Sequence, residues 1–95
     1  GQIPLDPATN QIVVGDITAQ ATRVLENLRI LLESEGLGLS HVVKTTIFMV
    51  DLSEFAQVNE VYARFFTENF PARSTIQVAA LPMGARVEIE AIAHY

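Results

Sequence analysis

The feature that most constrains the fold is a long segment in which apolar side chains recur every three or four residues. Within this segment, the side chains that share the spacing are Ile17, Ala21, Val24, Leu25, Leu28, Leu31 and Leu32. Such spacing puts them on one face of an α-helix, and that face has to be buried against another element. Asp16 is a good N-cap, and Gly36 tolerates the left-handed conformation that commonly ends a helix. The sequence therefore predicts an amphipathic helix from about Ile17 to Glu35.

A central strand and a second helix are predicted next. Residues 42–50 are rich in β-branched side chains, and the length and composition of this run indicate a strand buried on much of both faces. Asp51 and Glu54 have the spacing of a capping box. Apolar residues then recur at helical spacing until residues 69–71, where Asn-Phe-Pro breaks the pattern. We therefore expect a helix that begins after Asp51 and ends near Thr67.

The remaining segments are typical of short strands and turns. Two prolines near the start exclude a helix interior there, and residues 12–14 are predicted to be a short extended piece. Residues 73–78 and 86–94 alternate in the manner of strands. Together with the two helices, these segments predict an α+β fold in which both helices pack on one face of a mixed sheet. No repeat or long linker divides the chain, so we expect one domain over residues 1–95.

The composition is apolar for so short a chain. Hydrophobic residues make up 49% of the 95 residues and charged residues 18%, with a mean hydropathy of +0.29. A domain of this size has a high ratio of surface to volume, so part of the apolar surface is expected to be covered by another subunit. The chain has no cysteine. A disulfide scaffold, a thiolate zinc site and a cysteine nucleophile are therefore excluded within these residues.

Charge argues against a general nucleic-acid-binding module. Six basic residues stand against eleven acidic ones, which gives a net charge of −5, and Lys44 is the only lysine. Binding to phosphate backbones needs clustered Lys and Arg. No apolar run is long enough to cross a bilayer and no signal peptide is recognisable, so a cytoplasmic location is predicted. Because the chain begins at Gly1 in a strand-and-turn pattern, we expect a natural N-terminal segment to be missing from it.

Arg73 is the first candidate for chemistry. Pro71 fixes the entry to the strand that follows, so Arg73 is expected at its rigid beginning. Its guanidinium either points to solvent or makes a bidentate contact with a carboxylate of a ligand or of another subunit. The hydroxyl and main-chain N–H groups of Ser74 and Thr75 would add donors to the same anion.

Other polar residues have both a structural and a functional interpretation. Glu88 and Glu90 share one face of the last strand; they are either solvent-facing or placed to orient or deprotonate water, and one of them could oppose Arg73 on a neighbouring strand. Asn59 is either an exposed helix residue or an amide that holds a ligand near a cleft. His41 and His94 are interpreted as ordinary strand-end histidines, and no metal site is predicted.

Several stretches of the sequence resemble one protein family. They are Gly1–Pro4, Val43–Phe48, Asp51-Leu52, Phe55, Val58-Asn59, Tyr62, Phe65-Phe66, Phe70–Ser74, Leu81-Pro82 and Val87–Ala93. This pattern resembles the Rid family, the reactive intermediate deaminases, and is most similar to its RidA subfamily. The resemblance covers essentially the whole chain, and its most specific parts are the Pro-Ala-Arg-Ser stretch and the Glu-Ile-Glu-Ala-Ile-Ala strand.

The resemblance implies a fold, an assembly and an activity. The implied fold is chorismate-mutase-like α+β, assembled as a homotrimer with three clefts between subunits. The implied activity is hydrolysis of 2-imino acids, such as 2-iminobutanoate and the tautomers of 2-aminoacrylate, to 2-keto acids and ammonia. The partners implied are therefore a small 2-imino or 2-keto acid and two further copies of the chain. Neither a metal nor an organic cofactor is implied.

The resemblance also assigns roles to individual residues. Arg73 matches the family's signature arginine, and a bidentate guanidinium suits the carboxylate of a 2-imino acid. The Thr75 N–H would be a further donor to that carboxylate, and Asn59 and Gly1 match positions that line the cleft. Glu88 matches the glutamate that positions the attacking water.

This chain departs from the family pattern in two ways. Family members carry an N-terminal hairpin before the segment that begins at Gly1, with a tyrosine near the ligand and a serine just before that glycine. Many close relatives also have cysteine where this chain has Thr75. The main-chain donor survives that change, whereas thiol-based regulation does not.

Two other functions compete with imine hydrolysis. The first is a non-catalytic trimer whose Arg73 clefts sense keto or amino acids and act through a partner protein. The second is RNA cleavage or inhibition of translation, as labels of some relatives suggest. The acidic composition argues against the second. Retention of Glu88 favours the enzyme over the sensor.

Overall fold

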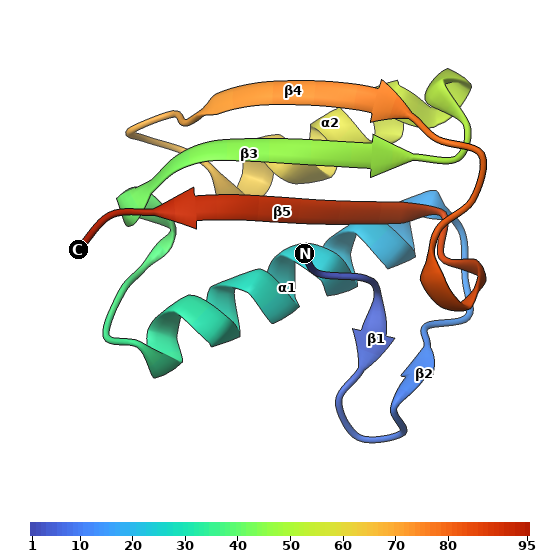
Figure 1. Cartoon of the computed structure of the whole chain (residues 1–95), viewed down its shortest axis with the longest axis horizontal. Coiled ribbons are helices and arrows are strands. Elements are labelled where there is room, and N and C mark those ends of the chain that lie inside the picture. Colours follow the sequence, from blue (N-terminus) through green and yellow to red (C-terminus); the bar gives the residue numbers. More distant parts are fainter.

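The structure, a computed structural model, describes all 95 residues and contains two helices and five strands. In chain order they are β1 (Leu5–Asp6), β2 (Gln11–Ile12), α1 (Ile17–Ser34), β3 (Val42–Met49), α2 (Phe55–Phe65), β4 (Ala72–Gln77) and β5 (Val87–Ala93). The main sheet has the order β4-β3-β5, with β3 parallel to β4 and antiparallel to β5. β1 and β2 form a small hairpin beside α1 (Figure 1). The predicted α+β fold with a mixed sheet is confirmed.

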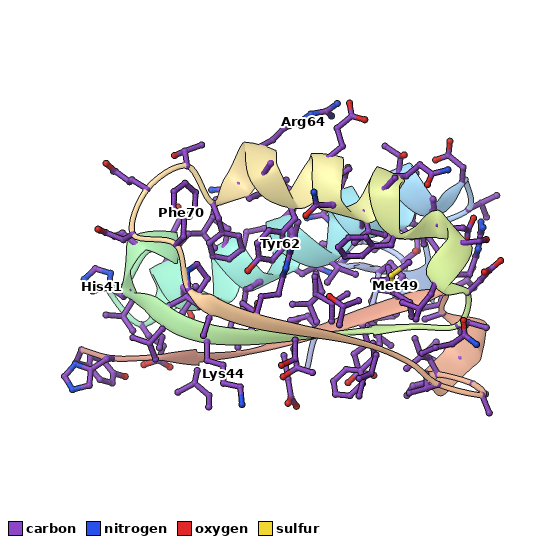
Figure 2. All side chains as sticks on the ribbon, turned by 90° about the horizontal axis from the view of Figure 1, so that it is seen from above. His41, Lys44, Met49, Tyr62, Arg64 and Phe70 are labelled. Carbon is purple, nitrogen blue, oxygen red and sulfur yellow. The ribbon has the colours of Figure 1, made fainter.

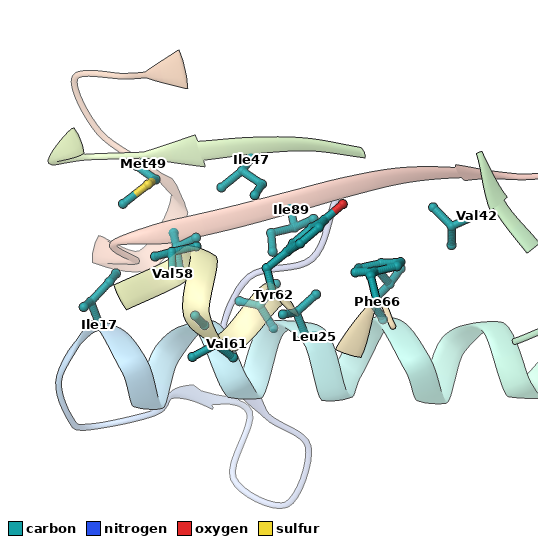
Figure 3. Packing of buried hydrophobic residues seen from close by; sticks show 14 of the residues in the cluster. Ile17, Leu25, Val42, Ile47, Met49, Val58, Val61, Tyr62, Phe66 and Ile89 are labelled. Carbon is teal, nitrogen blue, oxygen red and sulfur yellow. The ribbon is translucent and has the colours of Figure 1, made fainter. Parts of the chain in front are cut away.

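Both helices lie against the same face of the main sheet (Figure 1). The side chains between the two layers come from α1, α2, β3 and β5, as Figure 3 shows for Ile17, Leu25, Val42, Ile47, Met49, Val58, Val61, Tyr62, Phe66 and Ile89. The buried residues of each helix lie on one helical face, and the buried residues Ile47 and Met49 of β3 and Val87 and Ile89 of β5 are two residues apart. No helix of the structure is both long and apolar enough to span a bilayer.

The opposite face of the sheet is open in the single chain. β3 is the central strand, as predicted, but it is buried on one face only: Thr45, Ile47 and Met49 are buried, whereas Lys44 is exposed and Phe48 is half-buried. The prediction of a strand buried on much of both faces is therefore wrong for the isolated chain. The physical reason is that both helices share one face, which leaves nothing in the chain to cover the other.

The two ends of α1 are formed by the predicted residues. The Asp16 carboxylate accepts the Ala19 N–H at 2.9 Å. At the other end Gly36 adopts a φ of +74°, its N–H donates to the Glu33 carbonyl, and the Leu37 N–H reaches the Leu32 carbonyl at 2.9 Å. These two hydrogen bonds form a Schellman motif, which gives the last carbonyl groups of the helix hydrogen-bond partners.

The start of α2 differs from the prediction. Asp51 does accept a backbone N–H, from Ser53 at 2.9 Å. Hydrogen bonding from the side chain of Ser53, and then from its backbone, lowers the pKa of the Asp51 carboxyl. Asp51 caps a short 3-10 turn over Leu52–Glu54, and α2 begins after that turn. Glu54 does not complete a capping box, because its carboxylate binds the guanidinium of Arg86 from the last strand's entry. A long-range ion pair has replaced the expected local bond.

Candidate active site

Arg73 lies at the beginning of β4 and points toward α2. In the parallel register of β3 and β4 it is opposite Thr45, whose side chain is buried under α2. One guanidinium nitrogen, Nη1, donates to Oδ1 of Asn59 at 2.5 Å. The arginine and the asparagine that the sequence singled out are therefore brought together, although they are 14 residues apart. This one bond uses a single N–H, so most of the five guanidinium donors remain available to a ligand.

Two aromatic rings of α2 support the Arg73 guanidinium. Its Cζ atom is 4.9 Å from the centre of the Tyr62 ring and 5.4 Å from that of the Phe55 ring. Both distances are within the range of a cation–π contact. The Tyr62 hydroxyl lies 2.7 Å from Oγ1 of Thr45. Burial raises the pKa of Tyr62, while the Thr45 bond and the charge of Arg73 act in the opposite direction.

The backbone N–H of Thr75 points to the free edge of the sheet. β4 pairs with β3 on one side only. The N–H of Val78, three residues further on, donates to the Met49 carbonyl of β3. Backbone donors alternate between the two edges of a strand, so the N–H of Thr75 is directed away from β3. An unpaired main-chain donor thus lies on the same strand as Arg73, as the proposed role of Thr75 requires.

A pocket of about 690 Å³ opens beside Arg73. Its lining comes from the second half of α2, the loop that follows, and the start of β4, and it consists of Asn59, Tyr62, Ala63, Phe66, Thr67, Phe70, Pro71 and Arg73. Figure 2 shows Tyr62 and Phe70 on the helix side of the sheet, whereas Lys44 projects from the opposite side. Half of the lining residues are hydrophobic, so the cationic group of Arg73 stands at the wall of a hollow with both apolar and polar surface.

Glu88 and Gly1 form a separate group on the open face of the sheet. Gln2 pairs with Ile89 through two backbone bonds, of 2.7 and 3.0 Å, which holds the first residues against β5. A methyl group added at Gly1 would overlap Oε2 of Glu88. Gly1 also lines a smaller pocket of about 300 Å³ together with Lys44, Thr46 and Glu90. Absence of a side chain at Gly1 is what leaves room for the Glu88 carboxylate.

Arg73 and Glu88 do not meet within one chain. β3 separates β4 from β5, so the prediction that Glu88 or Glu90 opposes Arg73 on a neighbouring strand is wrong. In the sheet register Arg73 is aligned with Thr45, and Glu88 is aligned with Phe48. Positions that differ by an odd number along a strand point to opposite faces, so the two side chains lie on opposite faces of the sheet.

The aromatic rings of Phe55 and Tyr62 contribute to this site through their contacts with Arg73. The apolar spacing of the predicted second helix indicates only that such residues face the core. Phe55, Asn59 and Tyr62 are spaced by four and three residues, so they share one helical face. That face is turned toward β4, where Arg73 enters it. The sequence does contain one signal for this site, the polar Asn59 within an apolar helical stripe. It does not reveal which strand faces that stripe.

The histidines take part in local backbone bonds. Nδ1 of His41 accepts the Gly38 N–H at 3.0 Å, and the backbone of His94 donates to the His41 carbonyl at 3.0 Å. These bonds stabilise the end of the sheet where β3 begins and β5 ends. No group of three or more His, Asp or Glu side chains is assembled that could hold a metal ion.

Comparison with known proteins identifies the family. The family model described as Endoribonuclease L-PSP matches residues 1–95. The chain belongs to this family, the Rid family. It is also close to the RidA deaminases within the family: it is 51% identical to the 2-iminobutanoate/2-iminopropanoate deaminase of Salmonella typhimurium, in a match that covers 98% of this chain and 74% of that enzyme.

Two further proteins are similar to almost the whole chain. Protein DfrA of Myxococcus xanthus is 62% identical over 93 residues, which cover 98% of this chain and 71% of DfrA. The crystal structure of TdcF from E. coli with bound serine superposes with a TM-score of 0.91 at 45% identity, and covers 98% of this chain and 75% of TdcF. The fold and the family are therefore shared over almost all of the residues described here.

Proposed function

We propose that this protein hydrolyses 2-imino acids to 2-keto acids and ammonia. The observation that carries the proposal is the Arg73 guanidinium, which Asn59 and two rings hold in place while its other donors stay free beside a pocket. A guanidinium in this state is suited to the carboxylate of an α-substituted acid. The name of the Salmonella relative states the same chemistry, and the TdcF structure holds a small α-amino acid.

Binding of the substrate would fix the position of the imine carbon. Arg73 donates two hydrogen bonds to the substrate carboxylate, and the outward N–H of Thr75 donates a further one. The Asn59 bond removes rotational freedom from the guanidinium before the substrate arrives, so less entropy is lost on binding. The C2 atom of the substrate then occupies a defined place relative to Arg73.

Hydrolysis requires a water molecule on the other side of C2. In the proposed reaction, the Glu88 carboxylate takes a proton from that water as its oxygen bonds to C2. The C=N electron pair moves to nitrogen, which takes the proton from Glu88 to give a tetrahedral carbinolamine. Glu88 then transfers the hydroxyl proton of the carbinolamine to its amino group, which leaves as ammonia, and the 2-keto acid remains. One water is consumed and one ammonia is released, so the atoms balance without any redox partner.

Glu88 can act on a substrate bound by Arg73 only if it comes from a neighbouring chain. This follows from their positions on opposite faces of the sheet. The open face supplies an apolar surface for such a neighbour, because Ile76 and Ile92 are 47% and 60% exposed there and Phe48 is half-buried. We therefore propose a homotrimer in which each cleft combines the Arg73 group of one chain with the Gly1–Glu88 group of the next.

The description of the family model also raises RNA cleavage as a candidate. A nuclease needs cations along the phosphate backbone. The net charge of −5 and a single lysine do not favour this function. Arg29, Arg64 and Arg86 are moreover already paired with carboxylates. We therefore retain imine hydrolysis as the proposed function.

The proposal is tested by comparing variants of Arg73 and Glu88 on imines generated in situ by a dehydratase. Arg73→Ala is expected to lower kcat/KM by about 100-fold or more, because hydrogen bonds between charged groups are lost. Glu88→Gln is expected to lower kcat by about 100-fold while 2-keto acid affinity stays within about threefold. The control is Arg64→Ala, since Arg64 is exposed on α2 and paired only with Glu60.

Two results would contradict the proposal. Equal rates of imine hydrolysis for wild type and both variants would show that neither Arg73 nor Glu88 takes part in the reaction. Binding of 2-keto acids by an assembled wild-type protein that does not accelerate imine decay would support the sensor in place of the enzyme. Circular dichroism and size-exclusion profiles of each variant ensure that loss of activity is not loss of fold.

A further inference from the structure

The pocket beside Arg73 extends well beyond what a carboxylate anchor needs. We infer that it holds the side chain of the 2-imino acid, so that the protein acts on substrates with branched aliphatic or aromatic side chains in preference to those with a methyl group. The inference rests on the proposed function and adds to it the substrate class. Its key residues are Ala63, Phe66 and Phe70, none of which binds the carboxylate or the water.

The floor and one wall of the pocket are aromatic. Phe66 is only 2% exposed, and its ring stacks on that of Tyr62 with centroids 4.5 Å apart. Phe70, by contrast, is 75% exposed although it lines the pocket. An apolar ligand placed between these rings would remove from water the surface that Phe70 now exposes, and burial of such surface is favourable.

The wall that carries Phe70 is shaped before any ligand arrives. Asn69 adopts a φ of +52°, a left-handed conformation that asparagine accepts more readily than most residues. Pro71 follows Phe70 and restricts it to extended backbone. The loop thus returns the chain from α2 to β4 along a fixed path. The loop therefore loses little conformational freedom when the side chain of a ligand enters the pocket, so the pocket is suited to discriminate between ligands.

Size and charge define the side chain that fits. Pockets of about 300–1,000 Å³ commonly hold ligands of drug size. The volume of about 690 Å³ therefore leaves a methyl group with little contact once the carboxylate is on Arg73. Arg73 is the only charged residue of the lining, and besides it only Asn59, Tyr62 and Thr67 carry polar side-chain atoms. Acidic and basic side chains would find no partner there.

The test compares 2-imino acids that carry methyl, isobutyl and benzyl side chains, all released by one amino acid oxidase. Wild-type protein is expected to hydrolyse the isobutyl and benzyl substrates with a kcat/KM at least about tenfold above that of the methyl substrate. Ala63→Leu fills the pocket from α2 and is expected to lower kcat/KM for the two larger substrates about tenfold, with the methyl substrate within about twofold. Phe70→Ala is expected to act in the same direction.

The matched control is Ala56→Leu, because Ala56 is also exposed on α2 but lines neither pocket. Hydrolysis of the methyl substrate with no preference for larger ones would overturn the inference and leave the proposed function intact. Hydrolysis of none of the three by assembled protein would instead overturn the proposed function. If Ala63→Leu changes the oligomeric state, the result for Phe70→Ala decides between the two roles of the pocket. An equal change of kcat/KM for all three substrates would show that the pocket is a subunit contact and overturn the inference.

Discussion

Tyr62 links the buried core to the candidate active site, because it contacts Thr45 on one side and Arg73 on the other. Thr45 is 1% exposed, and its only side-chain partner is the Tyr62 hydroxyl, whose ring in turn supports Arg73. The position of Arg73 at the beginning of a strand was predictable from the sequence, because Pro71 fixes the preceding backbone. The supporting ring was not, because an aromatic residue on an apolar helical face is equally consistent with a purely structural role.

The substitution Tyr62→Phe tests the contact between Tyr62 and Thr45. The change leaves the Thr45 hydroxyl buried without its partner, so the free energy of unfolding should fall by about 1–3 kcal/mol, as measured in urea. Burial raises the pKa of Tyr62 in the folded state. Its contribution to stability is therefore complete below pH 10 and declines as the pH rises through the raised pKa. The difference between wild type and variant should shrink in that alkaline range.

Tyr95→Phe is the control for this measurement, because Tyr95 is 82% exposed. It should change neither the free energy of unfolding nor the alkaline profile by a measurable amount. A Tyr62→Phe variant as stable as wild type at neutral pH would show that the Thr45 hydroxyl finds another partner.

Local sequence signals determine the helix ends where no distant residue competes for them. Asp16 and Gly36 do what their positions predict, since their bonding partners are within four residues. Asp51 and Glu54 have an equally good local pattern, but Arg86 lies 32 residues further along the chain and captures the Glu54 carboxylate. A local pattern contains no information about that arginine, which is why this part of the prediction failed.

The end of α1 gives a direct test of its Schellman motif. Gly36 has a φ of +74°, where a Cβ atom is strained whatever space surrounds it. Gly36→Ala should therefore lower the free energy of unfolding by about 1–2 kcal/mol. Gly38→Ala is the matched control, because Gly38 has a φ of −132° and no atom near its Cβ position. Equal stability of the two variants would mean that the motif does not stabilise the helix.

On the scale of the whole molecule, the chain has one covered and one open sheet face. The apolar composition predicted that another subunit covers part of the surface, and alternation predicted which residues of the last strand share a face. Neither could place Arg73 and Glu88 relative to each other, because that depends on the strand order β4-β3-β5. Strand order is set by long-range packing, and it is what puts the two groups on opposite faces.

If the reaction needs two chains at each site, two inactive variants should complement each other in one oligomer. Arg73→Ala and Glu88→Gln chains carrying different tags are co-expressed, and oligomers that contain both are purified. In a trimer that contains both variants, one of the three clefts pairs an intact Arg73 with an intact Glu88 from the neighbour. Imine hydrolysis at about a third of the wild-type rate is therefore predicted, although each variant alone keeps only about a hundredth of that rate or less. Mixed oligomers as inactive as the single variants would contradict the shared site.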